Sequence, residues 1–338
     1  MKVTQGKVLV TGASGYIALR CTSELISKGY KVKGSLRNLN RIDEVKNSLG
    51  TGINNGNLEF CKLNLLNDEG WEEATSDCDY LFHIASPCSI EEPKNENDLV
   101  TPALEGTLRA LKAAHKSKIK KVVLTSSIGA IAYGHSKKYC NSEDWTDTSN
   151  DVGAYIKSKT IAEKAAWEFV RSQSEKTFKM TTINPGMVFG PLLSKDIDGI
   201  SANLITKLIT GEFPALPDIY FTVVDVRDVA KLHIQSLTND RSDNKRIIAT
   251  SEEGISFLEI SEILRELGFN KAPRSLIPNQ VINSLALFNR DMKSTSSMVK
   301  RGRYGADISE TISIFDWEPI PLKKTLEDMT TSLKKIVN

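Results

Sequence analysis

The chain has 338 residues, and its 44 lysines and arginines nearly balance its 42 aspartates and glutamates, so its formal net charge is +2. This balance gives no electrostatic support to a nucleic-acid or membrane-surface role, and we expect neither kind of partner. Hydrophobic residues make up 40% of the chain and charged residues 25%, which are the proportions of a globular protein. The length suits one large domain or two coupled ones.

Neither a membrane segment nor a metal site is expected. No stretch approaches the roughly 20 apolar residues of a membrane helix, and the amino end lacks a signal-peptide pattern, so we expect a cytoplasmic protein. The four histidines are scattered, and His83 is interpreted as a core residue of a strand. The cysteines are odd in number with no CxxC spacing, so we interpret them as reduced, mostly buried thiols: Cys21, Cys61, Cys78, Cys88 and Cys140.

Short β-branched runs alternate with helical patterns from residue 7 to residue 250, which predicts βαβ units around a parallel sheet. Helices are expected near 16–29, 41–49, 68–76, 99–117, 155–172 and 226–238, and Asn67 is the expected N-cap of the third. Because parallel crossovers are right-handed, helices should cover both faces of the sheet. The sequence therefore predicts an α/β, Rossmann-type, doubly wound fold with seven parallel strands, at 7–11, 31–36, 58–64, 80–85, 120–126, 179–184 and 246–250.

The alternation stops after residue 250. Helices are expected at 257–267 and 322–336, whereas the Lys/Arg/Ser-rich stretch 290–303 is interpreted as a solvated surface loop, with binding of a ligand phosphate as the alternative. Four lysines that flank the fifth strand are interpreted as a solubilising face: Lys116, Lys118, Lys120 and Lys121. We expect a dinucleotide-binding domain at 1–189 and 223–250, and a smaller, mainly helical substrate-binding lobe at 190–222 and 251–338.

The first strand runs into the residues TGASGYIA at 11–18, and a helical pattern follows at once. A dinucleotide pyrophosphate needs a turn free of Cβ atoms, so that backbone N–H groups and the helix amino end face the anion. Gly12 and Gly15 fit that need, and Ala18 stands where a third glycine is common. A simple tight turn is the alternative, but the position after the first strand of a βαβ unit favours the dinucleotide site.

The end of the second strand decides between NAD and NADP. An NAD site expects an acidic residue about 20 positions beyond the glycine turn, whereas an NADP site expects arginine and small hydroxyl groups for the 2′-phosphate. The sequence reads GSLRNLNR at 34–41, with no acid before Asp43. Arg37 and Arg41 could clamp the phosphate and Ser35 could donate to it, unless both arginines are merely solvated charges.

A candidate reaction centre follows the fifth strand. That strand ends at Ser126 and Ser127, and Tyr155 and Lys159 begin a helical pattern 28 positions later. Positions i and i+4 share a helix face, so these two side chains can act together while Lys157 points away. Reduction of a carbonyl leaves negative charge on oxygen, which needs a proton donor and a polar anchor. Tyr155 is the expected donor and Ser127 the expected anchor, with the Ser126 hydroxyl as the alternative anchor.

Lys159 would lower the pKa of the Tyr155 phenol and would bond the nicotinamide ribose. Taken alone, Tyr-x-x-x-Lys also occurs as an ordinary amphipathic pair on a helix. Its combination with the serine pair and the glycine turn is far more specific.

These residues resemble the extended short-chain dehydrogenase/reductases, in particular their dihydroflavonol-reductase-like branch. The likeness covers nearly the whole chain and is carried by VTGASGYIA at 10–18, FHIASP at 82–87, LTSS at 124–127, YIKSK at 155–159, NPGMVFGP at 184–191 and VDVRDVA at 224–230. The branch includes cinnamoyl-CoA reductases and NADPH-dependent aldehyde and ketone reductases. The run at 154–167 looks most similar to yeast-type ketoreductases and methylglyoxal reductases.

The resemblance implies a catalytic triad of Ser127, Tyr155 and Lys159. It also implies a set of cofactor-binding residues: Gly12, Ala13, Ser14, Gly15, Tyr16, Ile17, Arg37, Arg41, Asn64, Leu65, Ala85, Ser86, Pro87, Tyr155, Lys159, Pro185, Val188 and Ser201. The family usually has Asp at position 64, so Asn64 loses a charge there but keeps a hydrogen-bonding oxygen. Asp225 and Asp228 are then expected at a helix start and in lobe packing rather than in catalysis.

The sequence thus predicts an NADPH-dependent carbonyl reductase that acts on a small-molecule aldehyde or ketone, as a monomer or a homodimer. An NAD-dependent nucleotide-sugar epimerase or dehydratase is the enzymatic alternative, and Arg37 and the missing acid argue against it. A non-catalytic dinucleotide-sensing protein is the alternative of another class. It would be expected to lack Tyr155 or Lys159, and both are present.

Overall fold

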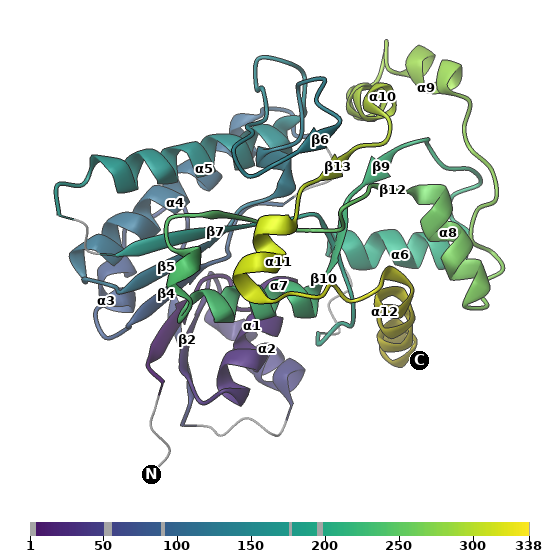
Figure 1. Ribbon diagram of the computed structural model, residues 1–338. Helices are drawn as coiled ribbons and strands as arrows, with labels where there is room; N and C mark the ends of the chain where they lie inside the picture. Colours follow the sequence, from purple (N-terminus) through teal and green to yellow (C-terminus); the bar gives the residue numbers. More distant parts are fainter. Residues whose placement is uncertain (1–4, 51–55, 89–91, 176–177, 195–198, 338) are drawn as a thin grey trace.

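The computed structural model describes residues 5–50, 56–88, 92–175, 178–194 and 199–337. Its centre is a parallel sheet of seven strands in the order β11-β7-β5-β4-β1-β2-β3 (Figure 1). The strands are β1 (Lys7–Val10), β2 (Lys31–Leu36), β3 (Leu58–Lys62), β4 (Tyr80–His83), β5 (Lys121–Thr125), β7 (Lys179–Pro185) and β11 (Arg246–Ala249). The predicted seven-stranded Rossmann-type sheet is confirmed.

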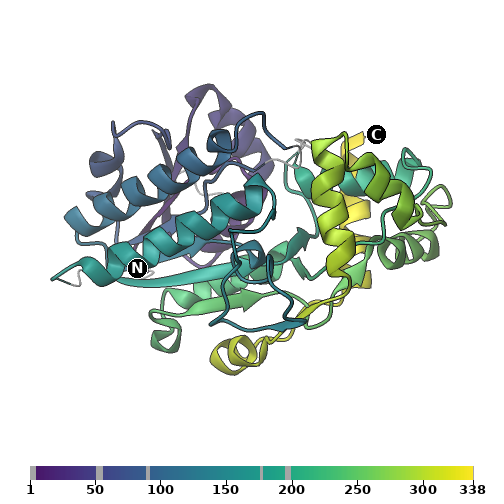
Figure 2. The ribbon, with the colours of Figure 1, turned by 90° about the horizontal axis from the view of Figure 1, so that it is seen from above.

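Helices cover both faces of this sheet. On one face α1 (Tyr16–Ser27) packs against α7 (Val226–Ser236), and α2 (Ile42–Leu49) lies beside α1. The other face carries α3 (Trp71–Thr75), α4 (Asn97–Lys116) and α5 (Ala154–Ser172), whose apolar side chains share one cluster with the central strands. Figure 2 shows α4 and α5 side by side. Strand β5 is buried along its whole length because it lies in the middle of the sheet, covered on both sides.

A second group of helices packs beside the carboxyl ends of the strands (Figure 1). Its core is one hydrophobic cluster shared by α6 (Ile200–Thr210), α8 (Phe257–Glu266) and α12 (Leu322–Val337). Helix α8 begins at a capping box in which Ser256 and Glu259 satisfy each other's backbone N–H groups. The predicted helices at 257–267 and 322–336 are confirmed.

Short elements join this group to the sheet, and the sequence patterns did not predict them. Three pairs of short strands contribute: β8 (Met187–Phe189) with β10 (Val223–Asp225), β9 (Tyr220–Phe221) with β12 (Ile255–Ser256), and β6 (Tyr139–Cys140) with β13 (Gly305–Ala306). Helices α9 (Asn279–Leu285) and α11 (Ser309–Phe315) were not predicted either. Two or three residues carry too little periodicity to identify a strand, so only a partner strand brought by the fold defines it.

The interpretation of residues 290–303 as a surface loop is wrong. Most of the stretch forms helix α10 (Arg290–Arg301), which packs against α9. Two of its basic side chains have partners within the protein: Lys293 pairs with Asp151, and the Arg301 guanidinium stacks 4.2 Å from the Tyr304 ring centroid. The stretch has few apolar residues, so these tertiary contacts add to the stability that its narrow apolar face provides.

Two smaller expectations also need correction. Lys121 is not part of a solubilising face, because its ammonium is buried beneath the loop after α7, where it pairs with Asp243 at 2.5 Å. Asn67 does not cap the third helix. The N-cap of α3 is Gly70, in the left-handed conformation, while the Asn67 side chain accepts from the Glu69 amide and tightens the preceding turn.

Other local expectations are confirmed. His83 is buried and its Nδ1 lies 3.1 Å from Thr11 Oγ1, and burial lowers its pKa to about 3. Asp225 caps α7 by accepting from the Arg227 amide, and Asp228 accepts from the Ile320 amide near α12. Among the cysteines, Cys88 is exposed and Cys61 is half-buried, while the other three are buried.

None of the helices that the structure describes is long and apolar enough to cross a membrane.

Candidate active site

The glycine turn lies between β1 and α1, as the sequence predicts. Gly12 has φ +69°, and a Cβ placed on it would lie 3.0 Å from the Cβ of Ala85, so glycine is required there. Gly15 is the N-cap of α1, which has no side-chain cap and no acidic residue in its first turn. The first amides of α1 therefore have neither an intrahelical acceptor nor a carboxylate to neutralise them, which suits a bound pyrophosphate.

The side chains of the turn differ in burial and in the contacts that they make. Ala13 is fully buried against Leu36 and Val45, so only its backbone is available to a cofactor. The Tyr16 hydroxyl donates to the carbonyl of Gly190 at 2.7 Å, which ties α1 to the segment after β8. Ser14 and Ile17 are half-buried at the mouth of the turn.

Arg37 follows β2 directly and is exposed. Within the described residues its guanidinium makes no ion pair or hydrogen bond, so it is free to meet a phosphate. Arg41 is held in a fork by Glu44, at 2.8 and 2.6 Å, and its Nη1 donates to Ser14 Oγ at 3.2 Å. Ser35 does not offer its hydroxyl to a phosphate: it is buried, and its Oγ accepts from the Gly12 amide at 3.2 Å. Strand alternation turns Ser35 inward and supports the glycine turn.

Further residues predicted to bind the cofactor lie at the carboxyl ends of β3 and β4, beside the glycine turn. Asn64 is exposed after β3, and Leu65 packs closely on Gly106 of α4. After β4 the chain is held by Thr11, whose hydroxyl accepts from the amides of Ile84 and Ala85 at 3.0 Å each. Ala85, Ser86 and Pro87 follow in an extended, half-buried run.

Helix α5 carries the candidate proton donor. Tyr155 lies in its first turn, and the Lys159 ammonium lies 5.8 Å from the centroid of the tyrosine ring. Lys159 is 8% exposed, and burial lowers its pKa. Lys157 points away, as predicted, and pairs with Glu96 at 2.8 Å on the surface. The one-turn spacing thus directs one lysine toward Tyr155 and the other toward solvent.

Ser127 and Tyr155, 28 positions apart, are brought together by the packing of α5 beside β5. Ser127 is the N-cap of the short helix η2 (Ile128–Ala130), and its Oγ accepts from the Gly129 amide at 3.0 Å. The same hydroxyl lies close enough to the Tyr155 phenol to lower the pKa of that phenol. Burial raises the pKa of the Tyr155 phenol above its ordinary value, an effect larger than the lowering by Ser127. Tyr155 is therefore protonated at neutral pH, as a proton donor must be.

The pKa of Tyr155 is raised rather than lowered in this structure, because burial of the phenol is the largest effect on it.

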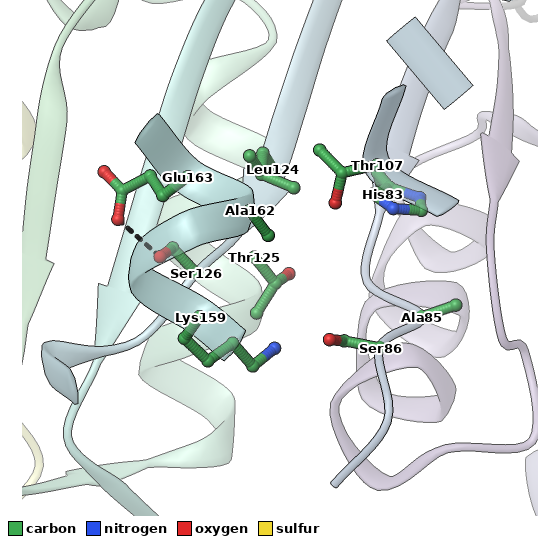
Figure 3. Close-up of a pocket in the computed structure, with 10 residues that line it drawn as sticks. All are labelled: His83, Ala85, Ser86, Thr107, Leu124, Thr125, Ser126, Lys159, Ala162 and Glu163. Carbon is green, nitrogen blue, oxygen red and sulfur yellow. Dashed lines mark hydrogen bonds between the residues drawn. The ribbon is translucent and has the colours of Figure 1, made fainter. Parts of the chain in front are cut away.

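A pocket opens at the carboxyl ends of β4 and β5 (Figure 3). Figure 3 shows the Lys159 side chain reaching into it, with Ser86 on the far wall and Ser126 turned toward Glu163. Ser126 is thus engaged with that carboxylate, which supports Ser127 as the anchor. The pocket is lined by His83, Ala85, Ser86, Thr107, Leu124, Thr125, Ser126, Lys159, Ala162 and Glu163.

Three predicted residues come from the segments after β7. Pro185 is the last residue of β7 and is buried, Val188 lies in β8 and is half-buried, and Ser201 lies in the first turn of α6. Gly186, between the first two, has no room for a side chain, because a Cβ there would lie 2.3 Å from the carbonyl oxygen of Thr222. This close packing fixes the course of the chain past the strand ends.

The sequence motifs did not identify two residues of the site, Cys88 and Glu163. The Cys88 thiol lies close enough to the Tyr155 phenol and the Lys159 ammonium to raise the pKa of both groups, and nothing in its sequence context indicated this. Glu163 lies fully buried one turn beyond Lys159. Its i+4 spacing on the catalytic helix was a usable signal, because a carboxylate on a buried helix face needs a partner.

Residues 8–249 of this chain match the NAD dependent epimerase/dehydratase family. The chain belongs to that family. The predicted membership of the extended short-chain dehydrogenase/reductases is confirmed. Within the family the chain is 38% identical over 269 residues to cinnamoyl-CoA reductase CAD2 of Medicago truncatula, covering 77% of this chain and 80% of that protein.

The chain is also similar to the yeast methylglyoxal reductase Gre2, in sequence and in structure. The NADPH-dependent methylglyoxal reductase GRE2 of Saccharomyces cerevisiae is 31% identical over 284 residues, with 77% of this chain and 82% of that protein covered. A crystal structure of the yeast methylglyoxal/isovaleraldehyde reductase Gre2 complexed with NADPH superposes with a TM-score of 0.80 at 26% identity, covering 98% of this chain and 99% of that one.

Proposed function

We propose that this protein is an NADPH-dependent carbonyl reductase that converts a small aldehyde or ketone to an alcohol. The proposal rests mainly on one observation. The side chains of Ser127, Tyr155 and Lys159 lie near one another at the carboxyl ends of the parallel strands, the same edge of the sheet that carries the glycine turn. The relatives named as reductases support the same reaction, and two of them are named with NADPH.

The uncapped amino end of α1, the positive φ of Gly12 and the free guanidinium of Arg37 fit an NADP(H) molecule. Bound NADPH supplies the hydride. The Tyr155 hydroxyl donates its proton to the carbonyl oxygen, and Ser127 Oγ hydrogen-bonds to that oxygen as negative charge develops. The Lys159 ammonium stabilises the phenolate that Tyr155 becomes after the transfer.

The proposed substrate is an aldehyde or ketone, of the kind named for the methylglyoxal/isovaleraldehyde reductase. The test measures loss of NADPH absorbance with a panel of methylglyoxal, isovaleraldehyde, cinnamaldehyde, cinnamoyl-CoA and simple ketones. Turnover of at least one compound is expected. If no compound is reduced while NADPH binds, the proposal of a carbonyl reductase is wrong.

The family also contains epimerases and dehydratases, by its own description. An epimerase must bind a nucleotide sugar and return the hydride to it, and it typically retains NAD. Arg37 at the end of β2, with no acidic residue there, favours the 2′-phosphate of NADP and hence the reductase.

Arg37→Ala is expected to raise the KM for NADPH roughly tenfold, because a charge-assisted hydrogen bond to the 2′-phosphate is lost. The KM for NADH, which lacks that phosphate, should stay nearly unchanged. Steady-state kinetics with both cofactors measure the difference. Arg171→Ala, at an exposed arginine in the last turn of α5, is the matched control. An equal increase in KM for NADPH and NADH would show that Arg37 does not bind the 2′-phosphate.

We also infer that residues 1–189 and 223–250 form the dinucleotide-binding domain, and that 190–222 and 251–338 form the substrate-binding lobe. The single hydrophobic cluster that joins α6 with α8 and α12 supports the grouping of the two separate segments. The proposed compartment is the cytoplasm, and the proposed partner is a small-molecule carbonyl rather than a nucleic acid or membrane. Sedimentation analysis would distinguish the monomer from the homodimer.

A further inference from the structure

Glu163 is a fully buried carboxylate on the catalytic helix, and the reaction proposed above does not use it. It follows Lys159 by one turn and Tyr155 by two, so all three side chains lie on the face of α5 that meets the sheet. A buried carboxylate is strongly disfavoured unless charged and hydrogen-bonding partners surround it. Five side chains provide those partners, and they are divided between its two oxygens.

The first oxygen, Oε1, is bound to the framework of the fold. Arg246, at the start of β11, donates to it at 2.6 Å, and the indole of Trp167 donates at 3.2 Å. Thr182 Oγ1 lies 3.2 Å away. Arg246 is itself fixed, because its guanidinium stacks 3.7 Å from the Trp145 ring centroid and donates to the carbonyls of Ser142 and Asp144. This side of the carboxylate is a rigid anchor.

The second oxygen, Oε2, faces the strand ends at the reaction centre. Ser126 donates to it at 2.5 Å, as the dashed line in Figure 3 marks, and the Asn184 amide donates at 2.7 Å. The same Asn184 amide nitrogen also donates to the backbone carbonyl of Ser127 at 3.2 Å. Oε2 of Glu163 therefore contacts the side chain of Ser126, the residue before Ser127. Through Asn184 it is also linked to the backbone carbonyl of Ser127.

We propose that Glu163 is a positioning residue that fixes Ser127, which follows β5, against Tyr155 and Lys159 on α5 through its Oε2 contacts with Ser126 and Asn184. The inference rests on the proposed function, because it concerns the spacing of the same three groups. The carboxylate is needed as an acceptor on both oxygens. In Glu163→Gln one oxygen becomes an NH₂ donor that faces the donors already present, so one side of the arrangement must shift.

Three variants separate positioning from stability. Glu163→Gln disturbs the whole cluster, and Ser126→Ala removes one Oε2 contact without removing the carboxylate. Trp167→Phe is the matched control, because it removes an Oε1 contact of the same carboxylate on the side away from Ser127. For each variant, the NADPH dissociation constant and the rate constant and amplitude of NADPH oxidation in a single turnover are measured. An unfolded fraction lowers the amplitude, whereas a displaced Ser127 lowers the rate constant.

Glu163→Gln is expected to lower the single-turnover rate constant roughly 100-fold, as a displacement of about 1 Å would, and Ser126→Ala roughly tenfold. The NADPH dissociation constant should stay within about twofold of wild type, the range of a neutral substitution. Trp167→Phe should lower only the temperature of unfolding. A wild-type rate constant in folded Glu163→Gln and Ser126→Ala, or equal loss in Trp167→Phe, would overturn the proposal. If Glu163→Gln does not fold, the comparison of the single-turnover rate constants of Ser126→Ala and Trp167→Phe tests the proposal.

Hydrogen exchange gives a second readout that needs no turnover. The Gly129 amide donates to Ser127 Oγ, so it reports on the position of that serine. Its exchange should be faster in Ser126→Ala and Glu163→Gln than in wild type, and unchanged in Trp167→Phe. If the wild-type protein reduces no carbonyl, the proposed function fails, and the exchange measurement still supports or contradicts the role of Glu163.

Discussion

Tyr155→Phe is expected to lower turnover roughly 100- to 10,000-fold, the range for loss of a general acid. The phenylalanine keeps the ring beside the Lys159 side chain but lacks the hydroxyl. Because burial keeps that hydroxyl protonated at neutral pH, the substitution removes the proposed proton donor. Steady-state turnover with the best carbonyl of the panel measures the loss.

NADPH binding should survive this substitution, so the dissociation constant for NADPH is measured beside turnover. Tyr30→Phe is the control, because Tyr30 is buried just before β2, at the amino ends of the strands and away from the pocket. A Tyr155→Phe enzyme with near wild-type turnover would show that the proposed mechanism is wrong.

Lys159→Met is expected to weaken both turnover and NADPH affinity, turnover by roughly 100-fold or more, since it removes the cation beside the phenolate. Lys157→Met is the matched control on the same helix. It breaks only the surface pair with Glu96, and such pairs contribute about 0–1 kcal/mol. Turnover and the NADPH dissociation constant of both variants are measured. The assignment fails if Lys157→Met is the more damaged enzyme.

The pH dependence of the wild-type enzyme gives the same assignment an independent check. The Lys159 ammonium is charged below its pKa, and burial lowers that pKa from the ordinary value of 10.5. Turnover should therefore fall as the pH rises, and the fall should begin at a lower pH than an exposed lysine would give. Lys159→Met, already without the cation, should lose this alkaline decline. If the pH profile of turnover is the same in Lys159→Met as in wild type, the alkaline decline is not caused by deprotonation of Lys159.

Much of the site could be predicted because its motifs are local. The glycine turn predicts its own backbone conformation, since only glycine tolerates the positive φ at position 12 so close to Ala85. The i+4 rule alone separates Lys159 from Lys157, and the structure directs them as expected. The central strands were predictable because strands buried on both faces form continuous apolar runs.

Residues whose roles depend on distant contacts were harder to predict. Lys121 looked like one of several surface lysines, yet a loop more than 100 residues further along the chain covers it. The helix at 290–301 has few apolar residues, and its contacts with α9 and with Asp151 help to stabilise it. In both cases the stabilising contacts are made with residues remote in sequence. Helix propensity and hydrophobic periodicity describe only neighbouring residues, so they give no information about these contacts.

The sequence by itself determined the sheet, the phosphate-binding turn and the pairing of Tyr155 with Lys159, because each depends on dihedral preferences or on spacing within one element. Only the tertiary structure decided how Glu163 divides its oxygens between Arg246 and the strand ends at Ser126 and Asn184. Those partners lie 83, 37 and 21 positions away from it. A buried carboxylate needs partners, but the folded sheet alone determines which donors surround it.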